Sequence, residues 1–201
     1  MQKEFSNFGD HAQVAMQAKT ASAETMGMAG VYHVVCRDAD GNLKWEEKFP
    51  NLVNAVGKEL MLDTLLSGSS YTTVGPYLGL ISGSSPTFAA ADTMSSHGGW
   101  TEFTNYTVGG SAVRGTASFS AATSSGTTPT NVTTKTASAI TYTITGGGGT
   151  VGGCFLVTGS GASSTQGNTS GTLYSAGAFS TAKVTTAGDT VSVTYSTTAT
   201  S

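Results

Sequence analysis

His97, Asp92 and Glu102 are the residues of this sequence whose types and spacing come closest to a hydrolytic site. A histidine near carboxylates could act as the general base for a serine nucleophile, and the chain is rich in serine. No serine, however, lies in a Gly-x-Ser-x-Gly turn, the arrangement that presents a nucleophile above a sheet. Among so many serines, one histidine near two carboxylates arises by chance. We therefore expect no catalytic residues and no enzymatic activity.

The cysteines and the other histidines offer no metal site. Cys36 and Cys154 are the only cysteines, each lies in an apolar run, and neither belongs to a Cys-x-x-Cys or Cys/His spacing. His33 lies inside a predicted strand, and His11 lies near the N-terminus. We expect two buried free thiols, no metal ligands and no cofactor, in a protein made in a reducing cytoplasm.

Two short motifs resemble ligand-binding loops but lack the required context. Residues 38–42, Asp-Ala-Asp-Gly-Asn, begin like a calcium loop, yet position twelve is Phe49 instead of glutamate, and both flanks are typical of strands. Residues 147–152 match Gly-x-Gly-x-x-Gly, but an apolar strand follows where a phosphate site needs a helix. We expect a hairpin turn at the first motif and no phosphate site at the second.

Charge is scarce and unevenly distributed. Of nine basic and twelve acidic residues, fifteen lie in positions 1–63. From Phe103 onward only four residues are charged: Arg114, Lys135, Lys183 and Asp189. A net charge of −3 argues against the clustered basic surface that nucleic acid requires. With 10% charged residues the chain should fold or assemble, presenting a surface of Ser, Thr and Gly that tolerates close neighbours.

No secretion or membrane segment is predicted. The first ten residues, MQKEFSNFGD, lack the apolar core of a signal peptide. No run approaches the ~20 apolar residues of a membrane span. We expect a soluble protein made in the cytoplasm, with no membrane partner.

The pattern predicts an N-terminal arm over residues 1–29 and one β-domain over residues 30–201. The arm is rich in Ala, Met and Gln without a sustained period, so we expect order there only where a neighbour holds it. Short strands then recur every roughly 10–15 residues between glycine turns, which is typical of an antiparallel β-sandwich or jelly roll. The predicted strands cover residues 31–36, 43–49, 77–81, 100–106, 113–119, 139–144, 153–157, 172–175, 178–180 and 190–195.

One α-helix is predicted at about residues 54–66. Asn54 is expected to be its N-cap, and Gly68 lies where a left-handed C-terminal residue is wanted. Four apolar residues share one face, which we expect to pack on the sheet: Val56, Leu60, Met61 and Leu65. Elsewhere, Glu102 and Arg114 fall on neighbouring predicted strands, and we expect a partly buried structural ion pair between them.

Several segments in order resemble the virion proteins of tailed phages and prophages. They are Gly99-Trp-Thr-Glu-Phe-Thr-Asn-Tyr106, Arg114, Phe119, Ile144-Thr-Gly, Thr150-Val-Gly-Gly-Cys-Phe-Leu-Val157, Gly171-Thr-Leu-Tyr-Ser, Phe179 and Gly188-Asp-Thr-Val-Ser-Val-Thr-Tyr195. The resemblance covers roughly residues 43–195 and includes capsid decoration (cement) and fibre-like proteins. It implies a structural role in the virion and supplies no catalytic residues.

On this resemblance we expect a decoration or cement protein that stabilises the head as a homo-oligomer, bound to the major capsid protein or other virion proteins. A head or tail fibre component is the alternative within the same class, and it predicts a trimer at low copy number. A carbohydrate-binding β-sandwich is the alternative from another class. It would stack sugar rings on four aromatic side chains: Tyr71, Tyr77, Trp100 and Tyr106.

Overall fold

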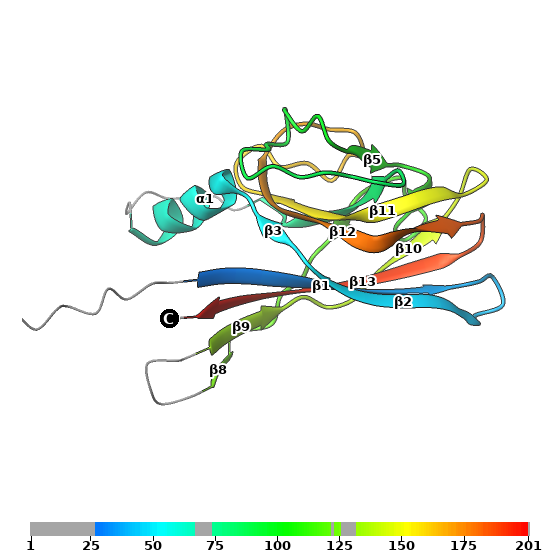
Figure 1. The fold of residues 1–201 in the computed structure, drawn as a ribbon, viewed down its shortest axis with the longest axis horizontal. Coiled ribbons are helices and arrows are strands. Elements are labelled where there is room, and N and C mark those ends of the chain that lie inside the picture. Colours follow the sequence, from blue (N-terminus) through cyan, green and yellow to red (C-terminus); the bar gives the residue numbers. More distant parts are fainter. Residues whose placement is uncertain (1–26, 67–73, 122, 126–131, 201) are drawn as a thin grey trace, which may run out of the picture.

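The fold consists of two antiparallel β-sheets that lie face to face (Figure 1). The computed structural model describes residues 27–66, 74–121, 123–125 and 132–200. In the first sheet, sheet A, the strand order is β2-β1-β13-β10-β6, with β9 paired to β13 and β8 paired to β9. These strands are β1 (Gly27–Arg37), β2 (Leu43–Pro50), β6 (Tyr106–Thr107), β8 (Thr123–Ser125), β9 (Val132–Thr136), β10 (Ile140–Ile144) and β13 (Thr190–Thr200).

The second sheet, sheet B, has the order β3-β12-β11-β4-β5, with β7 paired to β4. Its strands are β3 (Leu52–Val53), β4 (Tyr77–Ser82), β5 (Thr101–Phe103), β7 (Gly115–Thr116), β11 (Gly149–Thr158) and β12 (Thr172–Thr185). One helix, α1 (Ala55–Leu66), accompanies the strands in the described residues. The expected mainly β, antiparallel sandwich with one short helix is confirmed.

The main hydrophobic core lies between the two sheets. Alternate residues of a strand point to opposite faces, so β13 contributes Val191, Val193 and Tyr195 to this core. Two buried tyrosines of sheet A also reach across it: the Tyr142 hydroxyl donates to the carbonyl of Leu78 at 2.7 Å, and the Tyr32 hydroxyl lies 2.8 Å from that of Ser175. These contacts give buried hydroxyls the partners they need and fix the spacing of the sheets.

Sheet B is covered on its second face as well. Loops over residues 83–100 and 159–171 lie on that face and enclose a second cluster of apolar residues. Met94 and Trp100 come from the first loop, and they pack with Phe155 of β11. This double cover explains why β11 is a continuous apolar run, as the sequence predicted for a central strand.

Both glycine-containing motifs include a turn. Strands β1 and β2 form the expected antiparallel hairpin. At its turn, Asp38 Oδ1 accepts hydrogen bonds from the backbone N–H groups of Asp40 and Asn42, and Gly41 has φ +86°. Residues 145–148 connect β10 to β11, and residues 149–152 of the second motif belong to β11 itself, where a phosphate site would need a helix.

Two predicted strands are shorter than expected, two predicted segments belong to one strand, and β1, β11 and β13 are each longer than predicted. The predicted strand 100–106 divides into β5 in sheet B and β6 in sheet A, because a turn between them lets Phe103 and Tyr106, three residues apart, both enter the core. Of residues 113–119 only Gly115–Thr116 forms a strand, since the N–H of Arg114 pairs instead with the carbonyl of Ser164. The segments 172–175 and 178–180 belong to one strand, β12.

The helix is where the sequence predicted it, and the described residues of its predicted apolar face are partly covered. Val56, Leu60 and Met61 are half-buried, and Met61 packs against the main core. Gly57 approaches the backbone of Tyr174 closely. Leu62 and Leu66, which are not on the predicted face, are 48% and 78% exposed. Figure 1 shows α1 extending past the end of sheet B, which leaves its later turns without a sheet beneath them. The side chain of Leu65, and Gly68, lie outside the described residues.

Asn54 occupies the expected N-cap position, because α1 begins at Ala55 and the Asn54 carbonyl accepts the N–H of Lys58 at 3.1 Å. Its side-chain amide nitrogen donates to the carbonyls of Ala89 and Asp92, which ties the start of α1 to the loop over sheet B. Strand β1 begins at Gly27 and so includes residues 27–29 of the expected arm, because the end of β13 supplies them with backbone partners. Residues 1–26 lie outside the described part of the chain. In the described part, no helix is long and apolar enough to cross a membrane.

Candidate interaction surface

The face of sheet A that points away from the core is open to solvent along β1, β13 and β10. The buried residues of β10 alternate with Thr141 and Thr143, which are exposed. The buried residues of β13 alternate with hydroxyl side chains that are half-buried: Thr190, Ser192, Thr194 and Ser196. This set of outward residues, with Val31 and Val35 of β1, is called the hydroxyl face below. His33 and Arg37 also point outward on β1 and lie opposite Thr194 and Thr190 in the register.

The strand register arranges the hydroxyl face in rows. Val35, Ser192 and Thr141 stand side by side across three strands. The hydroxyls of Thr141 and Ser192 lie 3.1 Å apart, and those of Thr136 and Ser196 lie 2.9 Å apart. Hydroxyls that hydrogen-bond to one another cost less free energy to remove from water than hydroxyls without a partner. The face can therefore be covered by another protein surface at low desolvation cost.

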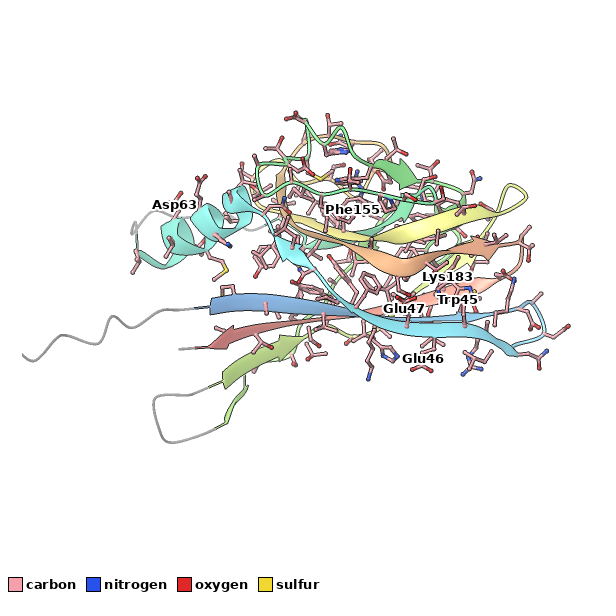
Figure 2. All side chains as sticks on the ribbon, viewed as in Figure 1. Trp45, Glu46, Glu47, Asp63, Phe155 and Lys183 are labelled. Carbon is pink, nitrogen blue, oxygen red and sulfur yellow. The ribbon has the colours of Figure 1, made fainter. Side chains whose placement is uncertain are left out.

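Charged side chains border the hydroxyl face along the edge strand β2. Lys48 is exposed there, and Glu46 Oε1 lies 2.7 Å from Nε2 of His33. Figure 2 shows Glu46 on the outer side of β2, with Trp45, Glu47 and Lys183 on the side that faces β12. An uncharged centre with a charged rim is the usual anatomy of a protein–protein interface. Charges on an edge strand also discourage unwanted strand addition.

The few charged residues of the second half of the chain face inward, away from this surface. Arg114 pairs with Glu102, Lys183 pairs with Glu47 at 3.0 Å, and Asp189 pairs with Lys44. Burial would raise the pKa of Glu47, but hydrogen bonds from the Ser180 N–H and the Lys183 ammonium outweigh it and hold that pKa below its ordinary value. The side chain of Lys135 lies outside the description. The other three charged residues after Phe103 all form ion pairs within the chain.

The expected pair between Glu102 and Arg114 is confirmed, and it is more deeply buried than expected. The guanidinium donates to both carboxylate oxygens, at 2.9 and 2.7 Å, and also to the backbone carbonyls of Ser163 and Asn168. The carboxylate accepts a further bond from the N–H of Gly167 at 2.7 Å. These bonds join β5 to the loop 159–171, so the pair holds in place the loop that covers sheet B.

The three residues of the possible hydrolytic cluster each have a separate structural partner. His97 Nδ1 donates to the carbonyl of Trp100 at 3.1 Å, and its ring stacks on the Trp100 ring at 3.8 Å. Asp92 accepts a hydrogen bond from the N–H of Ala89 within its own loop. Glu102 is occupied by Arg114. His97 and Glu102 line the same cavity of about 190 Å³. In a hydrolytic site, a carboxylate would hydrogen-bond to the histidine and orient it as the general base. Among the described residues, no such hydrogen bond joins His97 to Asp92 or Glu102.

The aromatic side chains considered for sugar binding are mostly buried. Trp100 is 5% exposed, with the His97 ring against it and Phe155 at 5.1 Å. Tyr106 is 1% exposed, and Tyr77 is half-buried against the second cluster. Tyr71 lies outside the described residues. A sugar ring needs a free aromatic face, which neither Trp100 nor Tyr106 offers.

The thiols are buried and unpaired, as expected. Burial, then the nearby Asp189 carboxylate, raises the pKa of Cys36 to about 11, and burial raises the pKa of Cys154 as well. Among the described residues, no group of three or more His, Cys, Asp or Glu side chains could hold a metal ion.

A largely apolar groove opens between α1 and the end of the sandwich where β1 begins and β13 ends. Its volume is about 450 Å³. It is lined by Leu60 and Met61 of α1, Tyr174 of β12, and Tyr195 and Thr197 of β13. The Tyr174 hydroxyl contacts both Met61 Sδ, at 3.5 Å, and the Thr197 hydroxyl, at 3.3 Å. The groove therefore lies at the mouth of the space between the sheets.

Comparison with known proteins adds no relative. No family model, no curated protein and no solved structure matches this chain.

Of the two surfaces described here, sequence reasoning anticipated the hydroxyl-rich, charge-poor surface but missed the groove. The groove combines residues of α1 with residues of β12 and β13 that lie more than a hundred positions later in the chain, so periodicity could not reveal it. The one available signal was the apolar content of residues 60–66, which exceeds what one helix face can bury.

Proposed function

We propose that this chain is a structural component of a tailed-phage virion, a capsid decoration (cement) protein that stabilises the head through contacts with the major capsid protein and with neighbouring copies. The observation that carries the proposal is the hydroxyl face, an open sheet face without charge at its centre, in a fold whose described charges after Phe103 are all paired internally. The resemblance of residues 43–195 to virion proteins supports the same role.

The physical argument concerns what a cement protein must do. It has to cover surfaces that the capsid repeats many times, so weak contacts multiplied by a lattice suffice for retention. An uncharged face of paired hydroxyls suits this task, because no buried charge must be compensated by the partner. A wide range of neighbouring surfaces could then be covered without a specific ion pair at each contact.

The test is binding of the purified protein to head shells of the encoding phage that were assembled without it. Thr141→Lys puts a charge in the hydroxyl face at an exposed position and should weaken binding by at least about tenfold, since a desolvated unpaired lysine is costly. Thr101→Lys makes the same change at an exposed position of β5, in the other sheet, and should bind like the wild type.

Co-sedimentation with a range of protein concentrations measures both affinities. Circular dichroism and thermal unfolding establish that each variant is folded. Failure of the wild-type protein to bind any head shell would reject the decoration role. Equal binding by all three proteins would reject the hydroxyl face as the contact surface.

A further inference from the structure

Among the described residues, no segment fills the groove between α1 and the sandwich mouth. Its apolar lining comes from Leu60, Met61, Phe119 and Leu156, beside Tyr174 and Tyr195. An open apolar groove of about 450 Å³ indicates a docking site for an apolar segment of protein. The question is which segment occupies it.

The N-terminal arm joins the fold next to this groove. Gly27, the first residue of β1, pairs with Thr200, and Gly30 pairs with Thr197, which forms part of the groove wall. Gly27 lies three residues before Gly30, and a strand rises about 3.3 Å per residue, so the arm joins sheet A about 10 Å beyond that wall. Strand β1 begins at that end of the sandwich, beside the end of β13 (Figure 1).

The composition of the arm suits the groove. Residues 11–26 contain Val14, Met16 and Met26 among five alanines. With histidine counted as neutral, Lys19 and Glu24 are the only charged residues of this segment, and their charges are opposite. Methionine fills irregular apolar spaces well because its side chain is unbranched and flexible. Met28, two residues beyond this segment, already packs against the main core.

The sequence of the arm also indicates whose groove it enters. To reach the groove of its own chain, the arm would have to reverse direction soon after leaving β1. Of the residues that favour tight reversals, residues 11–26 contain no Gly, Pro, Asn or Asp and a single serine, Ser22, while Gly27 belongs to β1. A segment of 16 residues with so weak a turn signal spans about 24 Å as a helix and more when extended, which is far enough to reach an adjacent molecule.

We propose that residues 11–26 of one copy dock in the groove between α1 and the sandwich mouth of a neighbouring copy. The proposal rests on the proposed assembly role and names the contact between copies. Each subunit donates an arm and receives one, so the exchange either closes into a ring or continues from copy to copy.

Disulfide trapping in the full-length chain tests this directly. Met16→Cys is made in chains labelled with heavy nitrogen, and Thr64→Cys, at an exposed groove position of α1, is made in unlabelled chains. The mixed proteins are oxidised gently, and the linked peptides are identified by mass spectrometry. The native thiols do not interfere, because Cys36 and Cys154 are buried.

The expected result is a disulfide between the labelled arm and the unlabelled groove. Leu62→Cys, exposed on the same helix but not lining the groove, is the matched control and should cross-link at least fivefold less. Equal yields at both positions, or no cross-link at all, would overturn the proposal. A chain carrying both Met16→Cys and Thr64→Cys that links only within itself at every concentration would overturn it as well, and would assign the groove to its own arm.

A second pair of variants separates docking from misfolding. Leu60→Glu places a charge in the groove and should shift the oligomer towards monomer in light-scattering measurements, whereas Leu62→Glu should not. An unchanged oligomer for Leu60→Glu would contradict the proposal. Because these experiments use the purified chain alone, their outcome is independent of whether the protein binds a capsid.

Discussion

The ammonium of Lys44 on β2 lies 2.6 Å from Oδ2 of Asp189, which belongs to the turn before β13 and is almost fully buried. The same carboxylate oxygen accepts a hydrogen bond from the N–H of Thr186 at 2.8 Å. Burial would raise the pKa of Asp189, but the bonds from Lys44 and Thr186 outweigh burial and hold this pKa below its ordinary value. The hydrogen bond to Asp189 also raises the pKa of Lys44.

These shifts predict a loss of stability in acid. A carboxyl whose pKa is lower in the folded state contributes stability above its unfolded pKa of about 3.9, and this contribution disappears as the pH falls through the folded value. The melting temperature should therefore fall between pH 5 and pH 2. The Asp189→Asn variant should be less stable than the wild type at pH 7, and its melting temperature should fall less on acidification. An identical acid dependence in both proteins, measured by thermal unfolding, would contradict this account.

Breaking the buried pair of Arg114 and Glu102 should be costly. Arg114→Met leaves a buried carboxylate without its cation, and we expect the free energy of unfolding to fall by about 3–5 kcal/mol. The double variant Arg114→Met with Glu102→Leu removes both charges and should recover part of that loss. Urea unfolding measures all three proteins. A single variant within about 1 kcal/mol of the wild type would show that the pair does not hold the loop 159–171.

Two adjacent glycines in the loop over sheet B should respond differently to alanine. A Cβ on Gly99 would clash with the carbonyl oxygen of Thr87, whereas a Cβ on Gly98 would meet nothing within 4 Å. Gly99→Ala should therefore cost about 1–3 kcal/mol, as overpacking usually does. Gly98→Ala should change the free energy of unfolding by less than about 0.5 kcal/mol. Similar values for both variants would mean that the loop does not pack as described.

Neither thiol should react in the folded protein. Cys36 and Cys154 are buried, and the raised pKa of each disfavours the thiolate that attacks alkylating and disulfide reagents. A colorimetric thiol assay at pH 8 should detect no reaction in native buffer and reaction of both thiols in guanidinium chloride. Fast labelling of either cysteine under native conditions would be inconsistent with the packed core.

Local signals in the sequence predicted most of the fold. The hairpin of β1 and β2 follows from two β-branched runs around Asp38–Asn42, and the alternation in residues 139–144 identified a strand with one open face. The continuous apolar run of β11 indicated a strand covered on both faces, as the loops over sheet B show it to be. The pair of Glu102 and Arg114 could be predicted because charges are so rare in that region.

Features that depend on long-range packing could not be predicted. The four apolar residues of the predicted helix face gave no sign that the later turns of α1 extend past sheet B. The crossing from sheet B to sheet A between Phe103 and Tyr106 depends on both rings entering one core, which is a property of the assembled sandwich. Asn54 was predicted as a cap from its position, yet its amide is used by a loop more than thirty residues away.

The most direct test of the central claim is electron microscopy of intact particles of the encoding phage, at a resolution that traces this chain. The account predicts many symmetry-related copies on the head, each with the hydroxyl face of β13 and β10 covered by a neighbouring subunit. A handful of copies per particle, or copies whose hydroxyl face is exposed to solvent while another surface makes the contacts, would contradict it.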